Sequence, residues 1–228
     1  MDDTTKRALI AYLEQQVTSH KRAKMDEIIK NRTRHITVLL EDIFQQHNAS
    51  AVVRSAECFG IQDLHIIQDR FNFSVNTGVA MGSSKWISMY RYGNTPDAFK
   101  ALKDQGYRIV ATTPHAKASN LEDLPLDRKF ALVFGTENVG LSAYAMEHAD
   151  EYVKIPMYGF TESFNVSVSA ALSLYHTTTV MRASSIDWKL SSQEELDVRL
   201  FWLRKSIRGI KEFEKMFFES FGVSSNTN

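Results

Sequence analysis

Short apolar runs alternate with segments of helical spacing along most of this chain, and this alternation limits the folds that it can adopt. The runs are rich in β-branched and aromatic residues, as buried strands are, and cover residues 36–40, 63–68, 107–112, 129–134 and 152–155. Strands that alternate with helices are typical of a mostly parallel sheet with helices on both faces. The sequence therefore predicts an α/β fold.

The segments around these runs carry helix signals. Asn48 and Gly60 would bound one helix as its N-cap and C′ residues, and Asn94 and Gly106 would bound another. Apolar residues at three-and-four spacing predict further helices over 4–17, 20–33, 164–181 and 193–218, the last as one long amphipathic helix. The resulting domain prediction is an N-terminal helical extension, a central α/β domain and a C-terminal helix with a tail, at residues 1–35, 36–182 and 183–228.

The composition excludes several classes of protein. The chain has 228 residues and a single cysteine, Cys58, which rules out an intramolecular disulfide and a zinc site with several thiolates. No apolar run approaches the roughly 18 residues of a membrane helix, and the first residues lack the basic-then-apolar order of a signal peptide. The seven histidines are scattered, so no metal site is expected. These features indicate a cytoplasmic protein without a membrane segment.

The net charge is +0, but the basic residues are unevenly distributed. One group lies near the N-terminus and another recurs at helical spacing near the C-terminus: Lys21, Arg22, Lys24, Arg32 and Arg34, then Arg204, Arg208, Lys211 and Lys215. Such groups can contact the phosphates of a nucleic acid. A solvated helix face is the alternative interpretation.

Three motifs place polar residues beside glycines, and they cover residues 48–60, 134–142 and 155–168. Other nucleotide-binding and hydrolytic signatures are missing from the sequence. It contains no Gly-x-Gly, no Gly-Lys-Ser/Thr, no His-Glu-x-x-His and no Gly-x-Ser-x-Gly. The three motifs therefore carry the functional prediction.

In the first motif, Arg54 lies six residues after Asn48, nearly two helical turns further on. Its planar guanidinium could bind a phosphate. An ion pair with Glu57 or another carboxylate is an equally open structural alternative. In the second motif, Gly135 ends an apolar strand at the place where α/β sheets bind ligands. Glu137 follows it, either as a site residue or as a helix-terminus carboxylate.

In the third motif, Pro156 and Gly159 predict a tight loop after a strand. Ser163 could act as the N-cap of the helix that follows, which explains neither Asn165 nor the rest of the motif.

Together the motifs resemble the signature motifs of the SPOUT superfamily of RNA methyltransferases, and within it those of the TrmH family of ribose 2′-O-methyltransferases. The resemblance covers about residues 36–182. It implies a C-terminal deep trefoil knot, S-adenosylmethionine as methyl donor, no metal, and a homodimer formed through the helix from Phe164 onward. Carried over position by position, it implies catalytic roles for Asn48, Arg54, Glu137, Ser163 and Asn165. It also implies donor contacts at Thr112, Gly135, Ile155, Met157 and Phe164.

The resemblance further implies that the partner is RNA, and that guanosine 18 in the D-loop of transfer RNA is the methylated nucleoside. The same chemistry on ribosomal RNA or on another transfer RNA site is one alternative. An RNA-binding protein that has kept the knot and lost turnover is another, although all five polar site residues are present.

Overall fold

The computed structural model describes residues 1–70, 76–114, 118–136 and 139–221, which divide into two compact units. One unit is Thr33–Trp188. The other combines Met1–Arg32 with the chain from Lys189 onward. The terminal segments, which the sequence assigned to separate parts, thus belong to one helical unit.

The Thr33–Trp188 unit is built on a seven-stranded sheet in the order β3-β2-β1-β6-β4-β7-β5, in which every described strand pair is parallel. Its strands are β1 (Ile36–Glu41), β2 (Asp63–Ile67), β3 (Ser88–Tyr92), β4 (Arg108–Thr112), β5 (Ser119–Asn120), β6 (Phe130–Phe134) and β7 (Glu151–Lys154). Each of the five predicted apolar runs forms a strand, so the parallel α/β prediction is confirmed.

β3 and β5 were not predicted. β3 is an edge strand with the sequence Ser-Met-Tyr-Arg-Tyr, and none of its residues is fully buried. β3 therefore lacks the apolar run by which a central strand, buried on both faces, is recognised in a sequence. β5 has only two residues, too few for any periodicity to appear.

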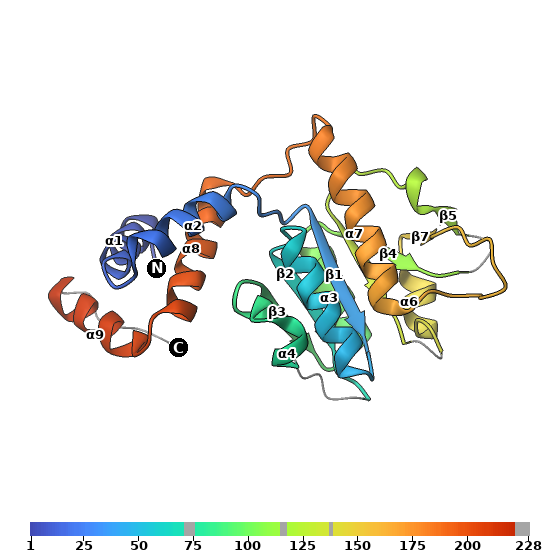
Figure 1. The fold of residues 1–228 in the computed structure, drawn as a ribbon, viewed down its shortest axis with the longest axis horizontal. Helices are drawn as coiled ribbons and strands as arrows, with labels where there is room; N and C mark the ends of the chain where they lie inside the picture. The colour runs from blue at the N-terminus through green and yellow to red at the C-terminus, as the bar shows by residue number, and fades with distance from the viewer. Residues whose placement is uncertain (71–75, 115–117, 137–138, 222–228) are drawn as a thin grey trace. The chain divides into compact units, whose positions relative to one another are not determined.

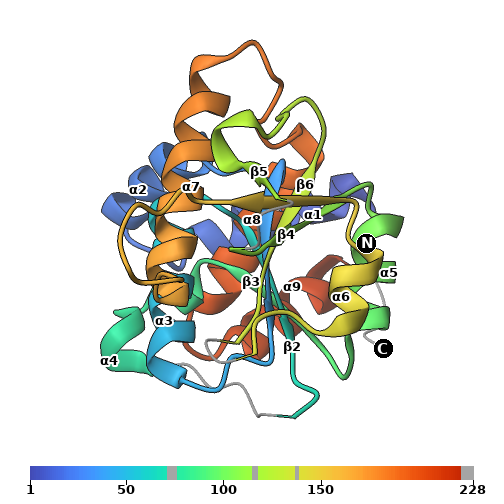
Figure 2. The same ribbon diagram turned by 90° about the vertical axis from the view of Figure 1, so that its right-hand side faces the viewer.

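Helices cover both faces of the sheet (Figures 1 and 2). α3 (Gln46–Cys58) and α7 (Val166–Ala183) pack side by side on one face, with the short α4 (Thr77–Ala80) next to α3. α5 (Thr95–Asp104) and α6 (Ala143–His148) lie on the other face. The remaining elements of this unit are the 3-10 helices η1 (Ser83–Lys85) and η2 (Leu121–Asp123).

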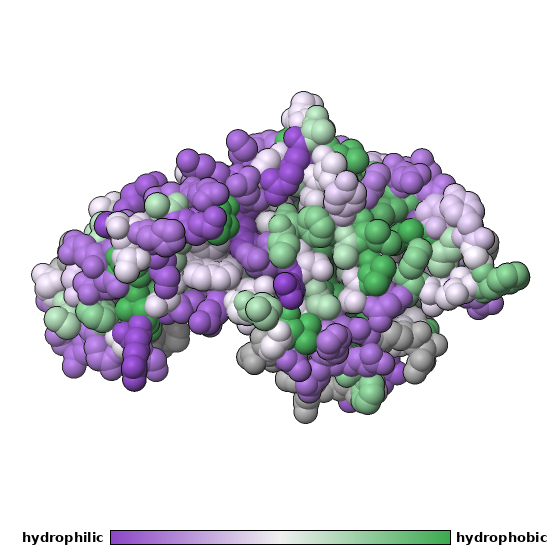
Figure 3. All heavy atoms as spheres, in the orientation of Figure 1, coloured by the Kyte–Doolittle hydropathy of each residue, from purple (hydrophilic) through white to green (hydrophobic). Residues whose placement is uncertain are grey.

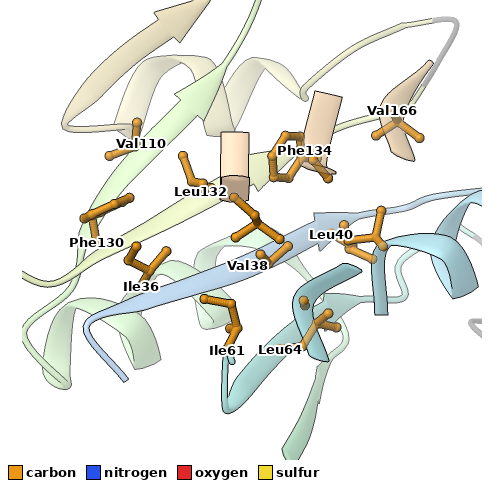
Figure 4. Packing of buried hydrophobic residues seen from close by; sticks show 14 of the residues in the cluster. Ile36, Val38, Leu40, Ile61, Leu64, Val110, Phe130, Leu132, Phe134 and Val166 are labelled. Atoms are coloured by element: carbon orange, nitrogen blue, oxygen red, sulfur yellow. The ribbon is translucent and has the colours of Figure 1, made fainter. Parts of the chain in front are cut away.

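The residues of β1 alternate between the two cores, as the two-residue period of a strand requires. Val38 and Leu40 belong to the cluster under α3 and α7, which Figure 4 shows from close by. Leu39 belongs to the cluster under α5 and α6. Both faces of β1 are therefore covered, and all six of its residues are buried.

Two predicted helix caps are corrected. α3 begins at Gln46, two residues before Asn48, with Gln45 at its N-cap position, so Asn48 lies inside the first turn. α7 is capped by Asn165, whose Oδ1 accepts hydrogen bonds from the backbone N–H of Ser167 (2.9 Å) and from its hydroxyl (2.6 Å). Ser163 is therefore not the cap. Gly60, Asn94 and Gly106 take the predicted positions.

The terminal unit contains α1 (Asp3–Glu14), α2 (Ser19–Ile29), α8 (Ser192–Ser206) and α9 (Ile210–Phe221). Arg199 of α8 joins both N-terminal helices, because its guanidinium pairs with Glu14 at 2.6 Å and with Asp26 at 2.7 Å. Removing residues 1–34 would leave this arginine and the apolar face of α8 without their partners.

The prediction of one helix over residues 193–218 is wrong. α8 ends at Ser206 with Ile207 as its C-cap, and Gly209 takes a left-handed conformation (φ 71°) before α9 begins. Glycine adopts this conformation without steric cost, so it separates two helices that share one apolar period. Ser191 forms a capping box with Glu194 at the start of α8. In the part of the chain that the structure describes, no helix combines the length and apolarity needed to cross a bilayer.

Candidate active site

A cavity of about 310 Å³ lies at the carboxyl ends of the central strands. Its walls come from the segments after β4, β6 and β7 and from the first two turns of α7. Parallel strands direct their carboxyl ends to one edge of a sheet, where α/β proteins bind ligands. All five residues predicted to contact the methyl donor line this cavity: Thr112, Gly135, Ile155, Met157 and Phe164.

The loop after β6 forms one wall and depends on two glycines. A Cβ atom at Gly135 would lie 2.3 Å from the carbonyl oxygen of Gly140, so the backbone itself fills the space of a side chain. Thr136 and Gly140 exchange two N–H···O=C bonds of 3.0 Å each. Gly140 has φ 74°, where a side chain would be strained. Glu137, predicted as a catalytic residue, lies outside the described residues.

The end of this loop is tied to β1 by a buried carboxylate. Glu41, the last residue of β1, accepts hydrogen bonds from the backbone N–H of Ser142 (2.8 Å) and from its hydroxyl (2.7 Å). Ser142 in turn caps α6. Glu41 was not among the predicted site residues. The signal that could have revealed it is a charged residue placed directly after the apolar run at residues 36–40.

The third motif forms the opposite wall. Ser163 and Phe164 line the cavity and are exposed, and the next residue, Asn165, begins α7. Two serines of α7, Ser169 and Ser173, add to the same wall from successive turns and were not predicted. The wall therefore combines backbone, hydroxyl groups and an aromatic ring.

A hydrogen bond joins the first and third motifs. The Asn165 amide donates from Nδ2 to Oδ1 of Asn48 at 3.2 Å, and the Asn48 amide donates to Gln45 at 2.9 Å. Asn48 is buried, with 5% of its surface exposed. Arg54 lies two turns along α3 and is exposed, and none of the ion pairs among the described residues involves it. The described residues therefore do not support the structural ion pair that was the alternative for Arg54.

The predicted RNA-binding residues differ in accessibility. Arg32 is 1% exposed, and its guanidinium lies 5.4 Å from the centre of the Trp202 ring, so it packs inside the terminal unit and cannot meet a phosphate there. Arg34 belongs to the other unit and pairs with Asp63 at 2.9 Å. Arg204 pairs with Glu214 at 2.7 Å. The exposed or half-exposed members in the terminal unit are Lys21, Arg22, Lys24, Arg204, Arg208, Lys211 and Lys215.

Gly209 changes the geometry predicted for the C-terminal basic residues. Arg204 and Arg208 precede the break, whereas Lys211 and Lys215 belong to α9. The four residues therefore do not lie on one face of a single helix. Within the described ranges, no cluster of three or more His, Cys, Asp or Glu residues could hold a metal ion.

Comparison with known proteins agrees with this geometry. The model of the SpoU rRNA Methylase family matches residues 35–175, which include β1 to β7 and most of α7. The chain belongs to the SpoU methylase family. A relative in Borreliella burgdorferi, named tRNA (guanosine(18)-2′-O)-methyltransferase, is 42% identical to this SpoU methylase over 215 residues. The matched region covers 94% of this chain and 98% of the relative.

Solved structures of other SpoU proteins share the fold. The TrmH/SpoU tRNA modifying enzyme of A. aeolicus has a TM-score of 0.76 and 27% identity, with 83% of this chain and 98% of that chain covered. The SpoU methyltransferase AviRb from Streptomyces viridochromogenes, in complex with its cofactor AdoMet, has a TM-score of 0.61 at 21% identity. That match covers 69% of this chain and 65% of AviRb.

Proposed function

We propose that this SpoU methylase transfers a methyl group from S-adenosylmethionine to the ribose 2′-oxygen of guanosine 18 in transfer RNA. The observation that carries the proposal is the cavity, because residues from two separate motifs and the end of β4 meet in it. The similarity to a guanosine-18 enzyme over 94% of the chain supports the choice of substrate.

The cavity fits a nucleoside-type donor in size and in chemistry. Its volume of about 310 Å³ lies at the lower end of the range of small-molecule pockets. Apolar side chains such as Leu121, Phe134 and Val153 give it an apolar wall suited to a base. Backbone groups at Gly135 and Ile155 and the Thr112 side chain would hold the polar edges of the donor.

The bound donor supplies a methyl group on a sulfonium sulfur. This sulfur departs as a neutral thioether and is therefore already a good leaving group. The protein must then position the ribose, accept or relay the hydroxyl proton, and exclude water. Ser163, on the cavity wall, and Asn165, beside it, would orient the ribose. Asn48 would fix Asn165 through their 3.2 Å hydrogen bond.

Arg54 would stabilise the developing negative charge on the 2′-oxygen, or act together with an RNA phosphate. A guanidinium is a poor base, because arginine keeps its proton in proteins. Its exposure on α3 leaves it accessible to a large substrate. Glu137 remains a proposed catalytic residue on the resemblance alone.

The fold and assembly of the family extend the proposal. We propose that the segment from Ile155 to Asn165 takes part in a trefoil knot and that the protein is a homodimer. Apolar side chains on α7 remain exposed, and Figure 3 shows hydrophobic side chains gathered on the face along which α7 runs. They are Val168, Leu172, Tyr175 and Val180, each at least 40% exposed, and Phe164, just before the helix, is 41% exposed. A second copy of α7 would cover them.

The RNA would also contact basic residues outside the cavity. The accessible members of the predicted set in the terminal unit are proposed to meet phosphates, with Arg32 removed from the set because it is buried. Phosphate contacts release counterions, so RNA affinity would fall as salt rises.

The test uses a transfer RNA transcript, which carries no modification, and tritium-labelled S-adenosylmethionine. We expect label in the ribose of guanosine 18, located by nucleoside mapping, and none in a transcript with adenosine at that position. Label in the ribose of another nucleoside would support the proposed reaction but identify a different substrate nucleoside. Ribosomal RNA is the second substrate to test, since the family description names it. Donor binding without transfer to any RNA would favour the non-catalytic alternative.

A further inference from the structure

Glu41 is a buried carboxylate that the proposed chemistry does not use. Its residue is 2% exposed, and no ion pair is found for it among the described residues. A buried carboxylate is costly unless hydrogen bonds compensate it. Three donors do so here. The Thr95 and Ser142 hydroxyls donate to Oε1 at 2.5 and 2.7 Å, and the Ser142 N–H donates to Oε2 at 2.8 Å.

These bonds fix the loop that forms one wall of the cavity. The described parts of this loop, residues 135–136 and 139–142, are joined near its start by the Thr136–Gly140 bond pair and held at its end by Glu41. Gly135, Thr136, Val139, Gly140 and Leu141 line the cavity, whereas Glu41 stands behind them and does not. Glu41 therefore acts on the cavity only through the loop.

Asp42 provides a contrast at the next position. It is also buried, at 4% exposure, but its carboxylate accepts from the backbone N–H groups of Asp69 (2.9 Å) and Arg70 (3.0 Å). Those residues follow β2 and do not line the cavity. Two adjacent carboxylates at the end of one strand thus hold two different loops.

We propose that Glu41 is a positioning residue for the methyl donor: through Ser142 it holds residues 139–142 in the conformation that forms one wall of the donor cavity. The proposal rests on the proposed function, since it takes the cavity as the donor site. Glu41 itself touches neither the donor nor the RNA. Donor affinity should therefore depend on this side chain, and RNA affinity should not.

The experiment compares Glu41→Leu, Glu41→Gln and Asp42→Gly with the wild type. Leucine removes all three acceptor contacts, so the Ser142 N–H loses its partner and the loop is released. Glutamine keeps one acceptor for that N–H, and its amide can donate to the two hydroxyls, so it should rescue. Glycine at position 42 removes the neighbouring carboxylate and tolerates the local φ of 51°.

Calorimetry with S-adenosylmethionine should show donor affinity weakened at least about tenfold in Glu41→Leu, as expected for lost hydrogen bonds to a charged group. Glu41→Gln and Asp42→Gly should stay within about threefold of the wild type, a smaller change than one such bond is worth. RNA affinity should be unchanged in all three. The KM for the donor should rise in Glu41→Leu while kcat at saturating donor is kept.

A folded Glu41→Leu variant with wild-type donor affinity would overturn the role of Glu41, and so would an equal loss in Asp42→Gly. If Glu41→Leu does not fold, Ser142→Ala and Ser142→Thr replace it. Alanine should weaken donor binding and threonine should restore it, and equal affinities would overturn the proposal. A wild-type protein that binds no donor would instead refute the proposed function.

Discussion

Gly135 offers the sharpest test of how the donor cavity is built. In Gly135→Ala, the new Cβ would lie 2.3 Å from the Gly140 carbonyl oxygen and 2.5 Å from the Leu141 nitrogen. Ordinary contact begins at 3.4 Å, so the two backbone segments would have to separate by about 1.1 Å (3.4 minus 2.3). The atoms that the Cβ meets belong to the backbone, so no side chain can turn aside to make room.

The cost follows from that separation. The two 3.0 Å bonds between Thr136 and Gly140 would lengthen beyond hydrogen-bonding distance, and each contributes about 1 kcal/mol. The strain of overpacking adds about 1–3 kcal/mol. If the loop opens locally to relieve the strain, closing it again around the donor costs about 3–5 kcal/mol, which is roughly 100-fold or more in donor affinity.

Calorimetric titration of Gly135→Ala with S-adenosylmethionine measures this loss directly. Gly159→Ala is the matched control. Gly159 lies in the third motif, and a Cβ there would meet nothing within 4 Å, so its donor affinity should not change. Donor binding by Gly135→Ala within threefold of the wild type would refute the argument from close packing.

Three further changes test other parts of the molecule. Arg54→Ala should lower methyl transfer at least about 100-fold, as loss of a charge-stabilising donor does, while calorimetry shows donor affinity within a few-fold of wild type. Lost donor binding would mean that Arg54 is misplaced. Leu172→Glu should convert the proposed dimer into a monomer, because a buried unpaired carboxylate costs several kcal/mol. Light scattering at micromolar concentration measures this, with Gln193→Glu as the control. A wild-type monomer would exclude the dimer. Burial lowers the pKa of His65 to about 4 from 6.5, so the unfolded chain binds the extra proton between these values and stability should fall as pH drops from 6.5 toward 4. The free energy of unfolding should change by about 3 kcal/mol over this range. Chemical denaturation of the wild type and of His65→Phe should show that this free energy depends more steeply on pH in the wild type.

The sequence revealed the parts of the fold whose physical signal is local. The central strands are buried on both faces, so each appears as an apolar run, as β6 does at Phe130–Phe134. Gly60 and Gly106 mark helix ends because the left-handed conformation selects glycine. By contrast, the half-polar edge strand β3 has no comparable pattern. The break at Gly209 was hidden because apolar spacing continues across it.

Helix caps show a second limit. Ser163 and Asn165 are both good capping residues, and local preference cannot choose between them. The choice depends on the third dimension, because Asn165 also donates to Asn48, which is 117 residues away in the chain. Sequence alone places both asparagines near a site, but not their contact with each other.

Glu41 shows why a site is harder to predict than a fold. Its partners, Thr95 and Ser142, lie 54 and 101 residues along the chain and meet it through tertiary packing of β1 with the segments at the starts of α5 and α6. β6, which leads into the loop of Ser142, pairs directly with β1 although β2 to β5 and the helices among them lie between these two strands in sequence. The motifs supply the atoms that face the cavity, and the strand order supplies the buried residues that hold those atoms in place. A motif can therefore be complete in the sequence and still fail to bind its ligand, if a residue outside it no longer supports the loop.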